Sequence, residues 1–309
     1  MDVTRRRAVA TGLGALAAAA GPARADASPV ARTRAGQVRG YTDQGISVFK
    51  GVRYGADTGG ERFQPPRLPQ PWAGVLDALA YGPASPQRSR DVGPTSEDCL
   101  FLNVWTPGLR DDGQRPVMVY IHGGAYSNGS GSSPLYDGVR LCRRGDVVVV
   151  TLNHRLNAFG YAYLPRLAPD FADSGNAGQL DLVLALQWVA DNIAEFGGDP
   201  GKVMVFGQSG GGAKIATLMA MPAARGLFHR AATMSGQQVT ASGPGNATRR
   251  TLAWLDALKL RPDQVGELAT LPAERLVEAF SAEDPVLGFG GLYFGPVLDE
   301  RSLTRHPFY

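Results

Sequence analysis

The chain has little cysteine, no long apolar run and no excess of charge of one sign, and each of these absences argues against a class of protein. Its 309 residues include only Cys99 and Cys142, so a single disulfide is the most that can form, and the sequence leaves that open. The apolar stretch at residues 8–20 is too short and too rich in glycine and alanine to span a bilayer. The formal charge of +3 comes entirely from residues 1–25, which hold four arginines and one aspartate. The rest of the chain is neutral overall, which argues against nucleic acid or an anionic surface as a partner.

The first 27 residues are expected to be an export signal. Thr4-Arg5-Arg6-Arg7 precedes the apolar stretch, and alanines at positions 23, 25 and 27 offer the small residues that a signal peptidase needs. The pattern is typical of the twin-arginine pathway and predicts a periplasmic or secreted protein. A permanent membrane anchor is the alternative. The mature domain is expected to span residues 28–309.

Five short apolar runs, rich in β-branched residues, are each followed by glycine, asparagine or proline. Runs of this kind are typical of buried strands in a parallel sheet. They comprise residues 100–105, 117–121, 147–152, 203–206 and 231–235.

An amphipathic helix lies between the third and fourth runs, and its apolar side chains form one stripe. The stripe consists of Leu182, Leu186, Val189, Ile193 and Phe196. Alternating strands and helices predict an α/β fold with a mostly parallel central sheet and helices on both faces. Residues 242–281 have little strand signal and are expected to form a helical insertion over the sheet, not a separate domain.

Ser209 stands in the sequence GQSGG, residues 207–211, directly after the apolar run 203–206. The pattern G-x-S-x-G predicts a nucleophile elbow, in which glycines let a strand turn into a helix within a few residues and expose the serine hydroxyl. An ordinary glycine turn is the alternative. A phosphate-binding loop is excluded, because it would need lysine directly after Gly212, where this chain has Ala213.

A second glycine-rich segment, HGGAY at residues 122–126, follows the apolar run 117–121. Small residues there let backbone N–H groups approach a bound carbonyl closely. During acyl transfer the carbonyl oxygen becomes negative, and each fixed N–H donor stabilises it by roughly 3–4 kcal/mol. Together with the N–H of Gly210, this segment predicts an oxyanion hole.

These segments belong to a longer series of motifs in which the chain resembles the type B carboxylesterase family, the group that includes cholinesterases and bacterial carboxylesterases. The resemblance implies an α/β-hydrolase fold and hydrolysis of small-molecule carboxylic esters through an acyl-enzyme, without metal or cofactor. The motifs are FKGVRY (residues 49–54), RFQPP (62–66), SEDCLFLNV (96–104), HGGA (122–125), GSGSS (129–133), NAG (176–178), WVADNI (188–193) and FGGDP (196–200).

The resemblance also assigns roles to residues of the site. It makes Ser209 the nucleophile, and it gives the backbone N–H groups of Gly124, Ala125 and Gly210 to the oxyanion hole. By the same resemblance, Ser235 is a buried, hydrogen-bonding serine near the site.

Two positions near these motifs depart from the family pattern. Gln208 replaces a glutamate that is common there, so a buried carboxylate beside the nucleophile is lost. No cysteine precedes Cys99, and Ser85 stands near the expected partner position, so the family's loop disulfide is not expected. Glu97 and Asp98 resemble structural ion-pair residues.

The third departure concerns the acid and the base that activate the serine. In this family they follow the serine by roughly one hundred and two hundred residues, in the order serine, acid, histidine. The sequence ends at Tyr309, and its downstream histidines, His229 and His306, do not match that order. The expectation is the amino-terminal portion of an exported serine carboxylesterase, with its last strands missing and little activity of its own. A non-catalytic, cholinesterase-like binding module is the alternative.

Overall fold

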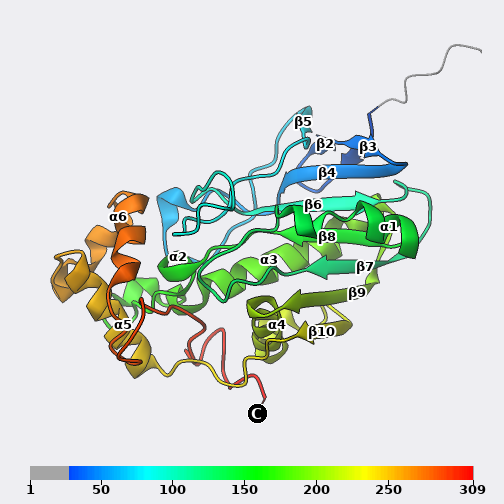
Figure 1. Ribbon diagram of the computed structural model, residues 1–309. Coiled ribbons are helices and arrows are strands. Elements are labelled where there is room, and N and C mark those ends of the chain that lie inside the picture. Colours follow the sequence, from blue (N-terminus) through cyan, green and yellow to red (C-terminus); the bar gives the residue numbers. More distant parts are fainter. Residues whose placement is uncertain (1–27, 309) are drawn as a thin grey trace, which may run out of the picture.

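A computed structural model of the chain describes residues 28–308, and the expected export signal lies outside them. Figure 1 shows a large twisted sheet with helices packed against it and a smaller sheet at one edge. The small sheet has the strand order β1-β2-β5, and the large sheet has the order β10-β9-β7-β8-β6-β4-β3. The strands are β1 (Val30–Arg32), β2 (Gln37–Arg39), β3 (Tyr41–Asp43), β4 (Ile46–Arg53), β5 (Val75–Asp77), β6 (Phe101–Thr106), β7 (Arg115–Tyr120), β8 (Val148–Leu152), β9 (Gly198–Gln208) and β10 (Arg230–Met234).

The five predicted strands all form, but they differ from the prediction in pairing and burial. β7, β8, β9 and β10 pair in parallel as expected, whereas β6 pairs antiparallel with both β8 and β4. The apolar run at 100–105 is therefore wrongly predicted as a parallel strand. β10 is half-buried to exposed, because it has a neighbour only on its β9 side in the described sheet.

Six α-helices and eight short 3₁₀ turns lie between and after the strands of the described chain. The α-helices are α1 (Val139–Gly145), α2 (Asn157–Tyr161), α3 (Ala177–Asn192), α4 (Gly210–Ala220), α5 (Pro244–Ala257) and α6 (Ala273–Glu278). The 3₁₀ turns are η1 (Gly59–Glu61), η2 (Pro134–Tyr136), η3 (Pro169–Phe171), η4 (Ser174–Asn176), η5 (Ile193–Phe196), η6 (Pro222–Ala224), η7 (Pro262–Ala269) and η8 (Ala279–Ser281). The predicted apolar stripe runs through α3 and η5 and is buried along its whole length.

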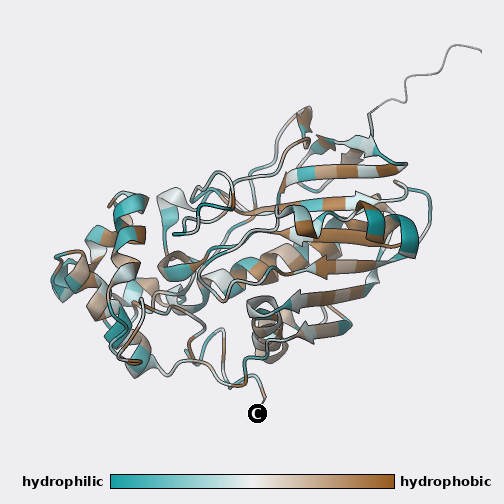
Figure 2. Cartoon of the chain, viewed as in Figure 1, coloured by the Kyte–Doolittle hydropathy of each residue, from teal (hydrophilic) through white to brown (hydrophobic). Residues whose placement is uncertain are grey.

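Helices cover both faces of the sheet. Successive residues of a strand point to opposite sides, so an apolar strand presents apolar side chains on both faces. In β8, Val148 and Val150 belong to the same core cluster as Leu186 of α3, whereas Val149 packs in another cluster with Val139 of α1. Figure 2 shows the consequence in colour: the central strands carry much of the apolar sequence, while the outer surface of α1 is strongly hydrophilic. The expected α/β-hydrolase fold is confirmed in these features.

The segment at 242–281 is helical, as predicted, and contains α5, η7, α6 and η8. Figure 1 places α5 and α6 beyond the end of the sheet at which β7, β9 and β10 terminate, and not over the sheet as expected. Trp254 of α5 anchors the segment: its ring lies 6.3 Å from that of Phe63 and 5.8 Å from that of Phe280, and its Nε1–H donates to the Leu276 carbonyl. The segment therefore stands opposite the carboxyl ends of the parallel strands.

Both cysteines are buried free thiols, so the expected absence of the loop disulfide is confirmed for Cys99. Cys142 lies in the middle of the short helix α1. No helix in the described part of the chain is long and apolar enough to cross a membrane.

Candidate active site

Ser209 occupies a strained turn between β9 and α4. Its backbone has φ 54° and ψ −124°, a region that residues with a side chain rarely adopt. Two hydrogen bonds hold this conformation: the Ser209 N–H donates to the Met234 carbonyl at 2.7 Å, and the Ser209 carbonyl accepts from the Ala213 N–H at 3.1 Å. The serine is half-buried, so its side chain lies at the boundary between the packed helix and solvent.

Glycines surround the serine because the backbone of the loop after β7 comes very close. A Cβ atom on Gly211 would lie 2.1 Å from the Ile121 carbonyl oxygen, and one on Gly207 would lie 2.7 Å from the same atom. A Cβ on Gly210 would lie 2.4 Å from the backbone nitrogen of Ala125. Both ends of the G-x-S-x-G pattern are therefore required by this contact.

The loop after β7 presents its backbone to the serine. Gly124 has φ +85° and Ala125 has φ +51°, so the chain turns sharply at these two residues. Gly124 is half-buried and Ala125 is exposed. Across residues 28–308, no acceptor takes a hydrogen bond from the N–H groups of Gly124, Ala125 or Gly210. The structure thus brings together all four residues that the sequence assigned to the site, and it leaves three backbone donors available beside Ser209.

The four histidines of the chain are each engaged away from the serine hydroxyl. Nδ1 of His229 accepts from the Val203 N–H at 3.2 Å, and Nδ1 of His306 accepts from the Ala241 N–H at 3.1 Å. His122 and His154 are buried, and each donates from Nδ1 to a neighbouring backbone carbonyl. Among residues 28–308, no hydrogen bond joins a histidine ring to the Ser209 hydroxyl, so Ser209 has no partner of the kind that activates a nucleophile.

A group that the sequence analysis missed lies directly behind the loop. Lys214 of α4 is fully buried, and its Nζ donates to the His122 carbonyl at 2.9 Å. Burial lowers the pKa of Lys214 to about 7. Burial, followed by the charge of Lys214, lowers the pKa of His122 to about 3 and that of His154 well below its usual value. The available signal was that Lys214 is the sole charged residue in the sequence of α4.

Three further predictions from the resemblance have mixed outcomes. Glu97 forms a bidentate pair with Arg62, and Asp98 pairs with Arg53 at 2.5 Å, so their structural role is confirmed. Ser235 lies next to the site but is exposed, because it follows the edge strand β10, so the expected burial is wrong. Gln208 is also exposed, so it does not give the serine the buried support that a carboxylate was expected to supply.

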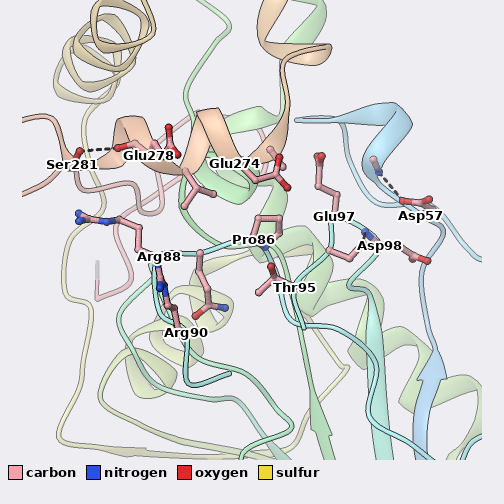
Figure 3. A pocket seen from close by; sticks show the side chains of 15 residues that line it. Asp57, Pro86, Arg88, Arg90, Thr95, Glu97, Asp98, Glu274, Glu278 and Ser281 are labelled. Carbon is pink, nitrogen blue, oxygen red and sulfur yellow. Dashed lines mark hydrogen bonds between the residues drawn. The ribbon is translucent and has the colours of Figure 1, made fainter. Parts of the chain in front are cut away.

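Two hollows open between the helical segment and the loops after the strands. One, of about 460 Å³, is lined by Ser127 and Asn128, directly after the glycine loop, and by Phe280 of η8. The other, of about 880 Å³, is shown in Figure 3, where Glu274 and Glu278 of α6 lie on one side and Arg88 and Arg90 of the 86–98 loop lie on another. Arg88 lines both hollows. Within residues 28–308, no group of three or more side chains could hold a metal ion.

A strained serine between a strand and a helix, packed against the backbone of a glycine-rich loop that follows a neighbouring strand, is typical of the α/β hydrolases. A sequence model of the carboxylesterase family matches residues 27–309, and the chain belongs to that family.

The relatives match most of this chain, but they are longer than it is. The para-nitrobenzyl esterase of Bacillus subtilis is 41% identical over 291 residues, which are 90% of this chain and 58% of the relative. The phenmedipham hydrolase of Pseudarthrobacter oxydans is 40% identical over 296 residues, again 90% and 58%. A solved carboxylesterase of Geobacillus stearothermophilus superposes with a TM-score of 0.83 at 44% identity, covering 90% of this chain and 57% of that one. The chain therefore spans somewhat more than half the length of the relatives it matches.

The contact at Gly211 yields a test of the close approach. In Gly211→Ala the new methyl group collides with the Ile121 carbonyl oxygen, so backbone must shift and the free energy of unfolding should fall by about 1–3 kcal/mol. The matched control is Gly266→Ala in η7, where a Cβ meets nothing within 4 Å. Urea denaturation should show the control unchanged or slightly more stable. Equal stability of both variants would contradict the packing described here.

The pKa of Lys214 yields a pH dependence of stability. In the unfolded chain this lysine keeps its proton up to about its ordinary pKa of 10.5, whereas in the folded protein it loses the proton near pH 7. Between these values the unfolded chain binds more protons, so stability rises with pH, by about 2–3 kcal/mol between pH 7 and 9. Lys214→Met should lack this part of the rise, and the exposed Lys202→Met should keep it. Parallel pH profiles of wild type and Lys214→Met in urea denaturation would show the assignment to be wrong.

Proposed function

We propose that this chain carries the nucleophile and the oxyanion site of a serine carboxylesterase. The observation that carries the proposal is the geometry at Ser209: a strained, half-buried serine beside three backbone N–H groups that have no acceptor within residues 28–308. A binding module has no need of a strained serine and unpaired donors, since both reduce stability.

The reaction would begin with attack of the Ser209 Oγ on the carbonyl carbon of the ester. The carbonyl oxygen becomes negative, and the N–H groups of Gly124, Ala125 and Gly210 stabilise it. Collapse of this intermediate breaks the bond to the alcohol, which leaves with a proton, and an acyl group stays on Ser209. Water then attacks the same carbonyl carbon, the bond from that carbon to the Ser209 Oγ breaks, and the carboxylic acid leaves while one proton of the water returns to Oγ.

An efficient reaction also needs a base that takes the proton of the Ser209 hydroxyl. We assign that role to no residue of this chain, because no hydrogen bond joins the Ser209 hydroxyl to a histidine within residues 28–308. When triad members are removed from other serine hydrolases, a rate of about 10³–10⁴ over water remains. We expect this chain to react with esters at that reduced level.

The proposed substrates are small-molecule carboxylic esters. Relatives include a para-nitrobenzyl esterase and a phenmedipham hydrolase, which suggests an uncharged aromatic ester as a first probe. The hollow beside Ser127 and Phe280 is next to the glycine loop, so the helical segment at 242–281 would form part of the substrate wall. We treat this segment as part of one hydrolase domain spanning residues 28–309.

A fluorophosphonate probe tests the nucleophile directly, since its phosphorus is attacked by the serine and its oxygen uses the same N–H donors. We expect slow covalent labelling of the purified chain at Ser209, detected by peptide mass spectrometry. Ser209→Ala should lose the label, and Ser235→Ala, which changes an exposed serine close by, should keep it. If neither the wild type nor the control is labelled, the chain lacks a working nucleophile and the binding-module interpretation is favoured.

We also propose that residues 1–27 direct export by the twin-arginine route, on the strength of their sequence alone. Changing Arg5, Arg6 and Arg7 to lysine keeps the charge but removes the arginine pair. Cell fractionation should then find the variant in the cytoplasm and the unchanged chain outside it. Equal export of both chains would rule out this route.

A further inference from the structure

Lys214 is a buried cation that the proposed reaction does not use. It lies in the first half of α4, five positions after Ser209, and none of its surface is exposed. Its one acceptor among the described residues is the His122 carbonyl oxygen, 2.9 Å from Nζ. The ring of Tyr126 also lies nearby, with its centroid 5.8 Å from Nζ.

The surroundings of Lys214 offer it no counter-charge. No carboxylate of residues 28–308 forms an ion pair with it, and the bases beside it, His122 and His154, are neutral. Arg155, next to His154, is neutralised by Asp181 of α3 at 2.6 Å. A buried charge with one neutral partner lowers stability. An apolar side chain of similar length would fill the same space more favourably, so packing alone does not explain a lysine here.

The position of its acceptor suggests what the lysine does. The His122 carbonyl belongs to the peptide that leads into Gly123, Gly124 and Ala125. Lys214 extends from the helix that begins directly after Ser209. One hydrogen bond therefore joins the loop that bears two oxyanion donors to the element that bears the nucleophile and the third. In a dry site, the charge also strengthens that bond and polarises the peptide toward its N–H side.

We propose that Lys214 is a positioning residue for ester hydrolysis, whose ammonium holds the His122 carbonyl and fixes the glycine loop at its correct distance from Ser209. That Lys214 serves ester hydrolysis rests on the proposed function. The hydrogen bond between Lys214 and the His122 carbonyl is observed independently of that function. Because the bond is stronger when the lysine is charged, the loop should loosen as Lys214 loses its proton. The titratable groups that face this cluster are His122 and Tyr126 after β7 and His154 after β8, and none of them changes charge between pH 6 and 8.5.

Hydrogen exchange measured by mass spectrometry tests the positioning role without requiring catalysis. The peptide covering residues 122–128 reports on the loop, and a peptide within α3 reports on the stability of the core. Lys214→Met removes the donor, Lys214→Gln keeps a donor without the charge, and Lys202→Met is the control for an exposed lysine that contacts Asp199 and Gln114. Exchange rates are corrected for their intrinsic pH dependence, and Ser209 labelling is followed in parallel.

We expect Lys214→Met to raise loop exchange about tenfold or more at pH 6.5 while α3 stays protected, and Lys214→Gln to restore part of the protection. Wild-type loop exchange should increase between pH 6 and 8.5, and the Lys214→Gln profile should be flat. Unchanged loop exchange in Lys214→Met, or an equal rise in α3, would overturn the proposal. If Ser209 is unlabelled in every variant, the proposed function fails, and the exchange data still decide the role of Lys214.

Discussion

The contact between two backbone segments governs the architecture of the site: the start of α4 lies against the loop that follows β7. Carbonyl and N–H groups of Ile121 and Ala125 come so close to Gly207, Gly210 and Gly211 that no side chain fits between them. This approach is possible because β7 and β9 are adjacent and parallel, so both end at the same edge of the sheet. Parallel pairing of two strands thus determines where a nucleophile and its donors meet.

The strain at Ser209 is supported by the elements on either side of it. Ser209 adopts an unfavourable backbone conformation, while β10 on one side and the first turn of α4 on the other hold it there through backbone hydrogen bonds. The donors of Gly124, Ala125 and Gly210 remain without acceptors in the part of the chain that the structure describes. Unpaired donors and a strained residue reduce stability, which is the usual signature of a site selected for chemistry. Lys214, a buried cation that donates to the His122 carbonyl behind the glycine loop, is a further group that reduces stability.

Much of the site could be predicted because its requirements are local. Glycines at fixed offsets from a serine, after an apolar run, report a tight strand-to-helix turn, and the HGGA segment reports close backbone approach in the same way. The apolar stripe of α3 could likewise be predicted from the helical spacing of its apolar residues. Features that depend on distant parts of the chain could not be predicted. The antiparallel pairing of β6 and the exposure of Ser235 depend on which strand lies beside each of them, and the periodicity of the sequence does not encode those neighbours. Lys214 was overlooked because a lysine in an apolar helix is ordinarily expected to face solvent.

We propose that Ser209 and three backbone donors form one preorganised acyl-transfer site. The most direct measurement is a crystal structure of the chain after reaction with a fluorophosphonate. We predict a phosphorus atom bonded to the Ser209 Oγ, with its oxygen about 2.7–3.1 Å from the backbone nitrogens of Gly124, Ala125 and Gly210. A phosphonyl oxygen directed to solvent, or a glycine loop displaced from Ser209 in that structure, would contradict it.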